Sequence, residues 1–116
     1  MSQAAAHALI SSKGAIVNVG AAAATRAALG MGAYAASKAG VARLTEAFAE
    51  ELKDQDVRVN AVLPSILDTP ANRADMGDAD AHRWVKPEAL AEVIVFLLSD
   101  AADAITGATL PVTGRV

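Results

Sequence analysis

The 116-residue sequence contains no cysteine, which excludes disulfide bonds, thiol catalysis and cysteine-ligated zinc. Aromatic residues make up 3% of the chain, which argues against a base-stacking platform or an aromatic cage. Lysine and arginine number 10 against 13 acidic residues and form no basic block, so neither a nucleic-acid nor a membrane-surface partner is expected. The longest apolar stretch, residues 89–98, contains Glu92 and is far shorter than the roughly 20 residues of a membrane helix.

The residues that are present are typical of a folded domain. Hydrophobic residues make up 53% of the chain and charged residues 20%, so disorder is not expected. The length fits a single domain over residues 1–116. Residues 1–9 carry neither the basic region nor the long apolar run of a secretion signal, and a cytoplasmic location is therefore expected.

Periodicity and turn residues predict an alternating series of elements. Gly30 and Gly32 favour a loop or broken turn before the longest helix, and Pro87 marks the start of another. Residues 65–86 are polar and aperiodic, which is typical of a functional lid or of a disordered segment. The predicted elements are a helix ending over 3–10 with Gly14 just beyond it, strands over 15–19, 57–64 and 108–114, and helices over 34–53 and 87–98.

This alternation predicts an α/β fold with parallel strands and right-handed crossovers. Strand 57–64 reads as buried on both faces, as in a parallel sheet. Three strands are few for a doubly wound sheet. We therefore expect part of a Rossmann-type doubly wound sheet, with three parallel strands, flanking helices and an exposed sheet edge.

The sharpest chemical motif is Tyr34-Ala-Ala-Ser37-Lys38. Residues four apart lie on the same face of a helix, and a lysine ammonium near a phenol favours the phenolate. Tyr34 is therefore a candidate general acid or base near neutral pH. Spacing alone leaves open an ordinary surface pair of residues.

The order of motifs around this pair resembles the C-terminal half of short-chain dehydrogenase/reductases. The resemblance covers residues 8–114 and rests on the strand AIVNV, the helix start YAASKAGV, the strand VRVNAVLP, Thr69 and the segment ITGATLPVTG. It implies an oxidoreductase that uses NAD or NADP and transfers hydride to or from a small-molecule carbonyl or alcohol.

The resemblance also implies the roles of individual residues. Tyr34 looks like the proton donor or acceptor, and Lys38 looks like the residue that assists it and binds the nicotinamide ribose. Pro64, Leu67 and Thr69 look like the turn that contacts the nicotinamide carboxamide.

Two positions depart from the family pattern. Ala21 stands where the family has a serine thirteen residues before the tyrosine, and Ser65 replaces the usual glycine of a Pro-Gly turn. Dihydropteridine reductases share the alanine, and they also resemble this chain in Gly30-Met31 and in the segment LDTPANR. We therefore expect a member of that branch, with a pterin-like substrate as one possibility.

No glycine-rich phosphate loop precedes the motif in this sequence, so we expect poor cofactor binding by the chain alone. An alternative function is an inactive half-domain that serves in oligomerisation or interaction. The expected partners are then further copies of the chain or a complementing N-terminal half.

Other candidate residues are weaker. Asp75, Asp78, Asp80 and His82 cluster in the lid, where a solvated acidic face is the favoured interpretation and a metal site is not predicted. Trp84 is expected to anchor the lid, although with Met76 it offers a cover for a flat substrate. His7 is interpreted as a surface or interface residue.

Overall fold

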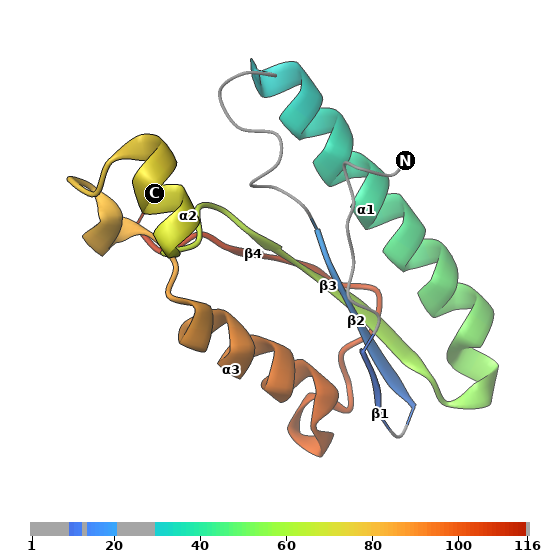
Figure 1. Cartoon of the computed structure of the whole chain (residues 1–116). Helices are drawn as coiled ribbons and strands as arrows, with labels where there is room; N and C mark the ends of the chain where they lie inside the picture. Colours follow the sequence, from blue (N-terminus) through green and yellow to red (C-terminus); the bar gives the residue numbers. More distant parts are fainter. Residues whose placement is uncertain (1–9, 13, 21–29, 116) are drawn as a thin grey trace.

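The computed structural model describes residues 10–12, 14–20 and 30–115, and for 10–12 and 30–37 it describes the backbone alone. Figure 1 shows strands crossing the middle of the molecule with helices on either side. Short 3-10 turns lie at Lys53–Gln55, Ala81–Arg83 and Asp100–Ala102. The main elements are β1 (Ile10–Ser12), β2 (Ala15–Val19), α1 (Gly30–Leu52), β3 (Arg58–Pro64), α2 (Pro70–Met76), α3 (Pro87–Leu98) and β4 (Thr109–Val112).

The four described strands form one sheet in the order β1-β2-β3-β4. β2 pairs with β3, and β3 with β4, in parallel. The predicted fold class, three parallel strands with flanking helices, is therefore confirmed. β1 is an additional antiparallel strand that pairs with β2, so that Ile10 lies opposite Val17.

Three local predictions are wrong. Ile10 lies in a strand where the end of a helix was expected, while residues 3–9 of that prediction lie outside the described residues. Gly14 follows β1 with a positive φ of 83° and turns the chain into β2, so it does not cap a helix. The longest helix begins at Gly30, so the expected break at Gly30 and Gly32 is absent.

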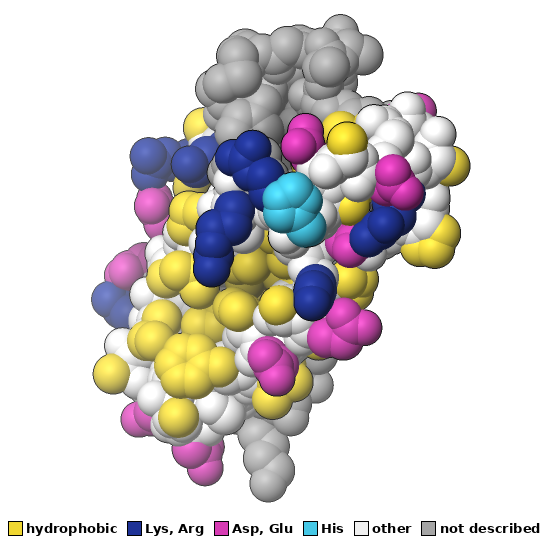
Figure 2. All heavy atoms as spheres, turned by 90° about the vertical axis from the view of Figure 1, so that its left-hand side faces the viewer, with side chains coloured by type: hydrophobic (Ala, Val, Ile, Leu, Met, Phe, Trp, Pro, Cys, Tyr) yellow, Lys and Arg dark blue, Asp and Glu magenta, His cyan; other side chains and the backbone are white. Residues whose placement is uncertain are grey.

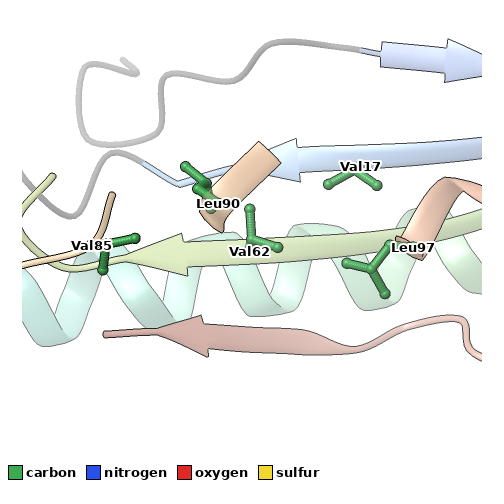
Figure 3. Packing of buried hydrophobic residues seen from close by; sticks show 5 residues of the cluster. All are labelled: Val17, Val62, Val85, Leu90 and Leu97. Atoms are coloured by element: carbon green, nitrogen blue, oxygen red, sulfur yellow. The ribbon is translucent and has the colours of Figure 1, made fainter. Parts of the chain in front are cut away.

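The parallel strands are covered on both faces. α1 lies on one side of the sheet, where Val41 packs against Ala61 and Leu63. α3 lies on the other side, and Figure 3 shows its two buried leucines against residues of β2 and β3. This second cluster consists of Val17, Val62, Val85, Leu90 and Leu97. Alternate residues of β3 therefore face opposite layers, as the parallel pairing requires.

Arg58 joins the end of α3 to the beginning of β3. Its guanidinium donates to the carbonyl oxygens of Leu97 and Ala102, each at 2.9 Å, and of Ser99 at 3.1 Å. The last carbonyls of a helix have no intrahelical partner, and a cation is favoured beside them. Arg58 therefore satisfies the end of α3 and fixes where the chain turns toward β4.

The polar segment after β3 is more regular than expected. Pro70–Met76 forms helix α2, so an aperiodic lid is the wrong description of these residues. Thr69 caps the helix, its side chain accepting a hydrogen bond from the Asn72 amide, and Pro70 occupies the first turn. Serine or threonine followed by proline is a recognised start signal for a helix.

Candidate active site

The parallel strands bring their carboxyl ends to one edge of the sheet, and α1 begins on that side of the molecule (Figure 1). Val41 packs against Leu63, which lies next to the last residue of β3. Lys38 precedes Val41 by about one helical turn and has an exposed side chain. Lys38 therefore lies in the part of α1 directed toward the carboxyl ends of the strands.

Tyr34 lies one turn before Lys38 in the described backbone of α1. Its side chain is outside the part of the chain that the structure describes. The helical register agrees with the predicted pair, since residues four apart share a helix face. The contact between phenol and ammonium stays a prediction.

The segment after β3 is held by a short bridge. Pro64 is the last residue of β3 and lies opposite Val112. Leu67 and Val85 form an isolated parallel bridge, in which the Asp68 amide donates to Val85 O at 2.7 Å and the Val85 amide to Ile66 O at 2.9 Å. These bonds do not use the Leu67 N–H, which points away from the bridge.

Asn72, which was not among the predicted site residues, also orders this segment. Its Nδ2 donates to the Leu67 carbonyl at 2.8 Å, and its backbone amide donates to Thr69 Oγ1 at 3.1 Å. The Thr69 oxygen is thus an acceptor within the chain, and its own O–H remains able to donate. The Thr69-Pro70 start signal would have located α2 and hence Asn72.

An ion pair between Asp68 and Arg73 joins the segment after β3 to α2. Arg73 Nε donates to Asp68 Oδ1 at 2.6 Å and its Nη2 to Oδ2 at 3.0 Å, which is a bidentate arrangement. The hydrogen bond from Arg73 holds the pKa of the Asp68 carboxyl below its ordinary value of 3.8. Arg73 also lies 4.0 Å from Asp78.

The structure also places the weaker candidate residues of the sequence. Trp84 is buried, with 7% of its surface exposed, which fits its expected role as an anchor of the lid. Trp84 and Met76 line a small cavity of about 200 Å³ together with Gly77 and other residues. The described part of the chain contains no group of three or more residues suited to hold a metal ion. Ala21 and His7 lie outside the described residues.

A family model described as enoyl-(acyl carrier protein) reductase matches residues 1–114. The chain is 38% identical over 109 residues to a 3-oxoacyl-[acyl-carrier-protein] reductase of Thermotoga maritima, which covers 87% of this chain and 44% of that protein. It is 37% identical over 112 residues to L-xylulose reductase of Caenorhabditis elegans, covering 88% and 45%.

The chain belongs to the short-chain dehydrogenase/reductase family. A solved structure described as a short chain dehydrogenase/reductase family protein superposes with a TM-score of 0.69 at 38% identity, covering 86% of this chain and 44% of that one. A mutant 4-hydroxyisoleucine dehydrogenase solved with NADH and succinate gives a TM-score of 0.70 at 28% identity, covering 89% of this chain and 46% of that one.

The chain spans about half the length of the curated relatives that it matches. The family supports NAD(P)-dependent oxidoreductase chemistry in general. Among the described residues, no helix is both long enough and apolar enough to cross a membrane.

Proposed function

We propose that this short-chain dehydrogenase/reductase chain carries the nicotinamide-facing part of a hydride-transfer site at the carboxyl edge of its parallel strands. The observation that carries the proposal is the convergence of two elements there. α1 brings the exposed Lys38 toward this edge, and β3 leads directly into the segment with Leu67 and Thr69. Ligands of open α/β sheets bind at this edge.

In this proposal Tyr34 and Lys38 handle the proton. A bound nicotinamide would supply or accept the hydride at the substrate carbon. The Tyr34 O–H would donate its proton to the carbonyl oxygen during reduction and would take it back from the alcohol during oxidation. The Lys38 ammonium, one turn away, would favour the phenolate that remains after proton donation.

The donors present after β3 fit the carboxamide of a nicotinamide. The Leu67 N–H is left out of the Leu67–Val85 bridge, and the Thr69 hydroxyl can donate because its oxygen already accepts from Asn72. A carboxamide offers an oxygen acceptor to such donors. Pro64 fixes the start of this segment at the end of β3. These residues suit NAD and NADP equally, because they would touch only the part that the two cofactors share.

The proposed substrate class is a carbonyl or alcohol compound of low molecular mass, with a pterin-like compound as the finer hypothesis. Ala21 and the segment 67–73 support the dihydropteridine-reductase-like branch by resemblance. The relatives include a 3-oxoacyl-[acyl-carrier-protein] reductase and L-xylulose reductase, so the substrate panel in a test must include all three classes.

Hydride transfer is tested by following NADH and NADPH oxidation with 3-oxoacyl thioesters, ketoses and quinonoid dihydropterins. The proposal predicts that Tyr34→Phe lowers any measured rate at least 100-fold, because general acid–base catalysis contributes about 10²–10⁴-fold. Tyr34→Phe removes only the hydroxyl. Ser99→Ala is the matched control, since it also removes one hydroxyl, at the end of α3. A Tyr34→Phe rate equal to that of the wild type would contradict the assignment.

A second candidate function is that of an interaction half-domain, favoured by apolar side chains exposed on both helical layers. Leu44 and Phe48 of α1 are 42% and 41% exposed, and Val95 and Phe96 of α3 are 65% and 45% exposed. Figure 2 shows hydrophobic side chains gathered along the face on the left of Figure 1. In this candidate function, a second copy or a complementing half covers such surfaces.

Complementation separates the two candidates. The chain is co-expressed with the part of the Thermotoga maritima relative that it does not match. Activity that Tyr34→Phe abolishes, in the co-expressed pair or in the chain alone, supports the hydride-transfer site and contradicts the inactive half-domain. Assembly of the pair without activity, or with activity that Tyr34→Phe leaves unchanged, supports the interaction half-domain.

A further inference from the structure

Ser65 makes a hydrogen bond that the glycine usual at this place in the family would not make. Its backbone amide donates to Val112 O at 3.1 Å, which extends the pairing of β3 with β4 by one residue. Its Oγ donates to Thr113 O at 3.0 Å. The hydroxyl therefore adds a second bond between the start of the segment after β3 and the residues after β4.

The residues after β4 also hold the far end of the same segment. The Arg115 amide donates to Arg83 O at 2.9 Å, and Arg83 Nη2 donates to Arg115 O at 2.9 Å. Between them, Gly114 has a φ of 61°, and a Cβ at this position would lie 2.7 Å from Arg83 O. Glycine therefore permits the close approach that these two bonds require.

Residues 65–68, 83–85 and 112–115 thus form a closed set of three segments, each hydrogen-bonded to the other two. The Leu67–Val85 bridge joins the first of these segments to the second. We call these three segments the loop junction. The chain's single tryptophan, Trp84, belongs to one of these segments and is buried. Because the three segments are far apart in sequence, loosening one side of the loop junction weakens the constraint on the other two.

We propose that Ser65 is a positioning residue whose hydroxyl holds Leu67 and Thr69 in place by tying their segment to Thr113. The tie joins two parts of the chain itself, so it would act by pre-organising the segment before binding. The consequence for cofactor contact rests on the proposed function. The effect of the hydroxyl on the order of residues 66–85, which we call the mechanical part of the proposal, does not rest on the proposed function.

The mechanical part is tested by amide hydrogen exchange, first by comparing the wild type with two Ser65 variants and one control variant. Ser65→Ala is expected to raise the exchange rates of the Asp68 and Val85 amides about threefold to tenfold, the range that corresponds to one neutral hydrogen bond. Ser65→Thr keeps a hydroxyl and is expected to restore protection. Ser99→Ala removes a comparable hydroxyl-to-carbonyl bond outside the loop junction and is expected to leave both amides unchanged.

Trp84 emission provides an independent readout. Ser65→Ala is expected to shift the emission to longer wavelength, because a loosened loop junction exposes the indole, and Ser65→Thr is expected to reverse the shift. Arg83→Gln removes the Arg83 side-chain bond to Arg115 and is expected to raise exchange at Asp68, in the neighbouring segment. Ser65→Ala and Arg83→Gln are both expected to leave the exchange of the Ala61 amide, in the centre of the sheet, unchanged.

Two outcomes overturn the proposal. One is unchanged exchange at Asp68 and Val85 in Ser65→Ala. The other is an equal rise at Ala61, because the hydroxyl would then support the whole sheet and would not position the segment. Repeating the measurement with NADH separates the role of Ser65 in ordering the segment from the proposed contact with the cofactor. Absence of any effect of saturating NADH in the wild type counts against the proposed function, while the exchange data without added NADH still decide the role of Ser65.

Discussion

At the residue scale, two glycines differ in what a side chain would meet. Gly14 has a φ of 83°, and a Cβ there would lie 2.8 Å from Asp56 O, whereas Gly40 in α1 has nothing within 4 Å. Gly14→Ala is expected to lower the free energy of unfolding by about 2–3 kcal/mol, because it combines a left-handed backbone with a clash. Gly40→Ala is expected to raise it by about 0.5–1 kcal/mol. Urea unfolding of both variants measures the difference, and equal effects would contradict the turn described for Gly14.

A second residue-scale prediction concerns a buried hydroxyl. Thr45 is fully buried in α1, and its Oγ1 has no hydrogen-bond partner among the described residues. Thr45→Val replaces the hydroxyl by a methyl group of similar size and is expected to raise the free energy of unfolding by about 1 kcal/mol. The control is Thr106→Val, which loses the bond from the Val59 amide to Oγ1 and is expected to destabilise. Destabilisation by both substitutions would show that Thr45 has a partner after all.

At the element scale, the ion pair that braces α2 has a defined pH dependence. The pKa of Asp68 is lowered by its hydrogen bond from Arg73, so the pair contributes stability above the ordinary value of 3.8. That contribution is lost as the pH falls through the lowered pKa. The difference in free energy of unfolding between wild type and Asp68→Asn is therefore expected to be constant above pH ~5 and to shrink below pH ~4. A difference that grows on acidification would contradict the pairing.

Elements that glycine or proline bounds in the sequence were predictable, and elements that depend on contacts with distant parts of the chain were not. The strand Ala15–Val19 stands between two glycines, and the helix Pro87–Leu98 begins at a proline, so both were predicted with their observed bounds. β1 was missed because it exists only through pairing with β2. α2 was missed because its apolar residues are few and its Thr69-Pro70 start signal was not used.

The candidate site divides in the same way. Tyr34, Lys38 and Thr69 were identified from spacing and resemblance within short segments. The loop junction joins residues 65, 83 and 115, and no local pattern indicates that these segments meet. Asn72 belongs to the same class, since its contact with the Leu67 carbonyl depends on the turn between β3 and α2.

At the scale of the whole molecule, the exposed apolar side chains predict association. Burying about 600 Å² of apolar surface contributes about 15 kcal/mol at ~25 cal/mol per Å². This exceeds or matches the roughly 4–15 kcal/mol cost of association. Light scattering over a hundredfold dilution is expected to show an assembly at micromolar concentration. Phe96→Ser is expected to weaken it, whereas Glu92→Ser on the same helix is expected to have little effect. A wild-type monomer throughout the series would contradict this prediction.

The most direct test of the proposed site is to map where a nicotinamide cofactor contacts the chain, by amide chemical-shift changes during titration with NADH. The account predicts weak binding, with Kd above ~1 mM (a free energy weaker than about −4.1 kcal/mol), because the sequence contains no glycine-rich phosphate loop. It also predicts that the shifts concentrate at Lys38, Leu67 and Thr69. The opposite result is a set of shifts around Lys53 and Asp103 at the amino ends of the strands, where a cavity of about 680 Å³ lies. That result, or no shift at Leu67 and Thr69 at saturating NADH, would contradict the assignment of the site.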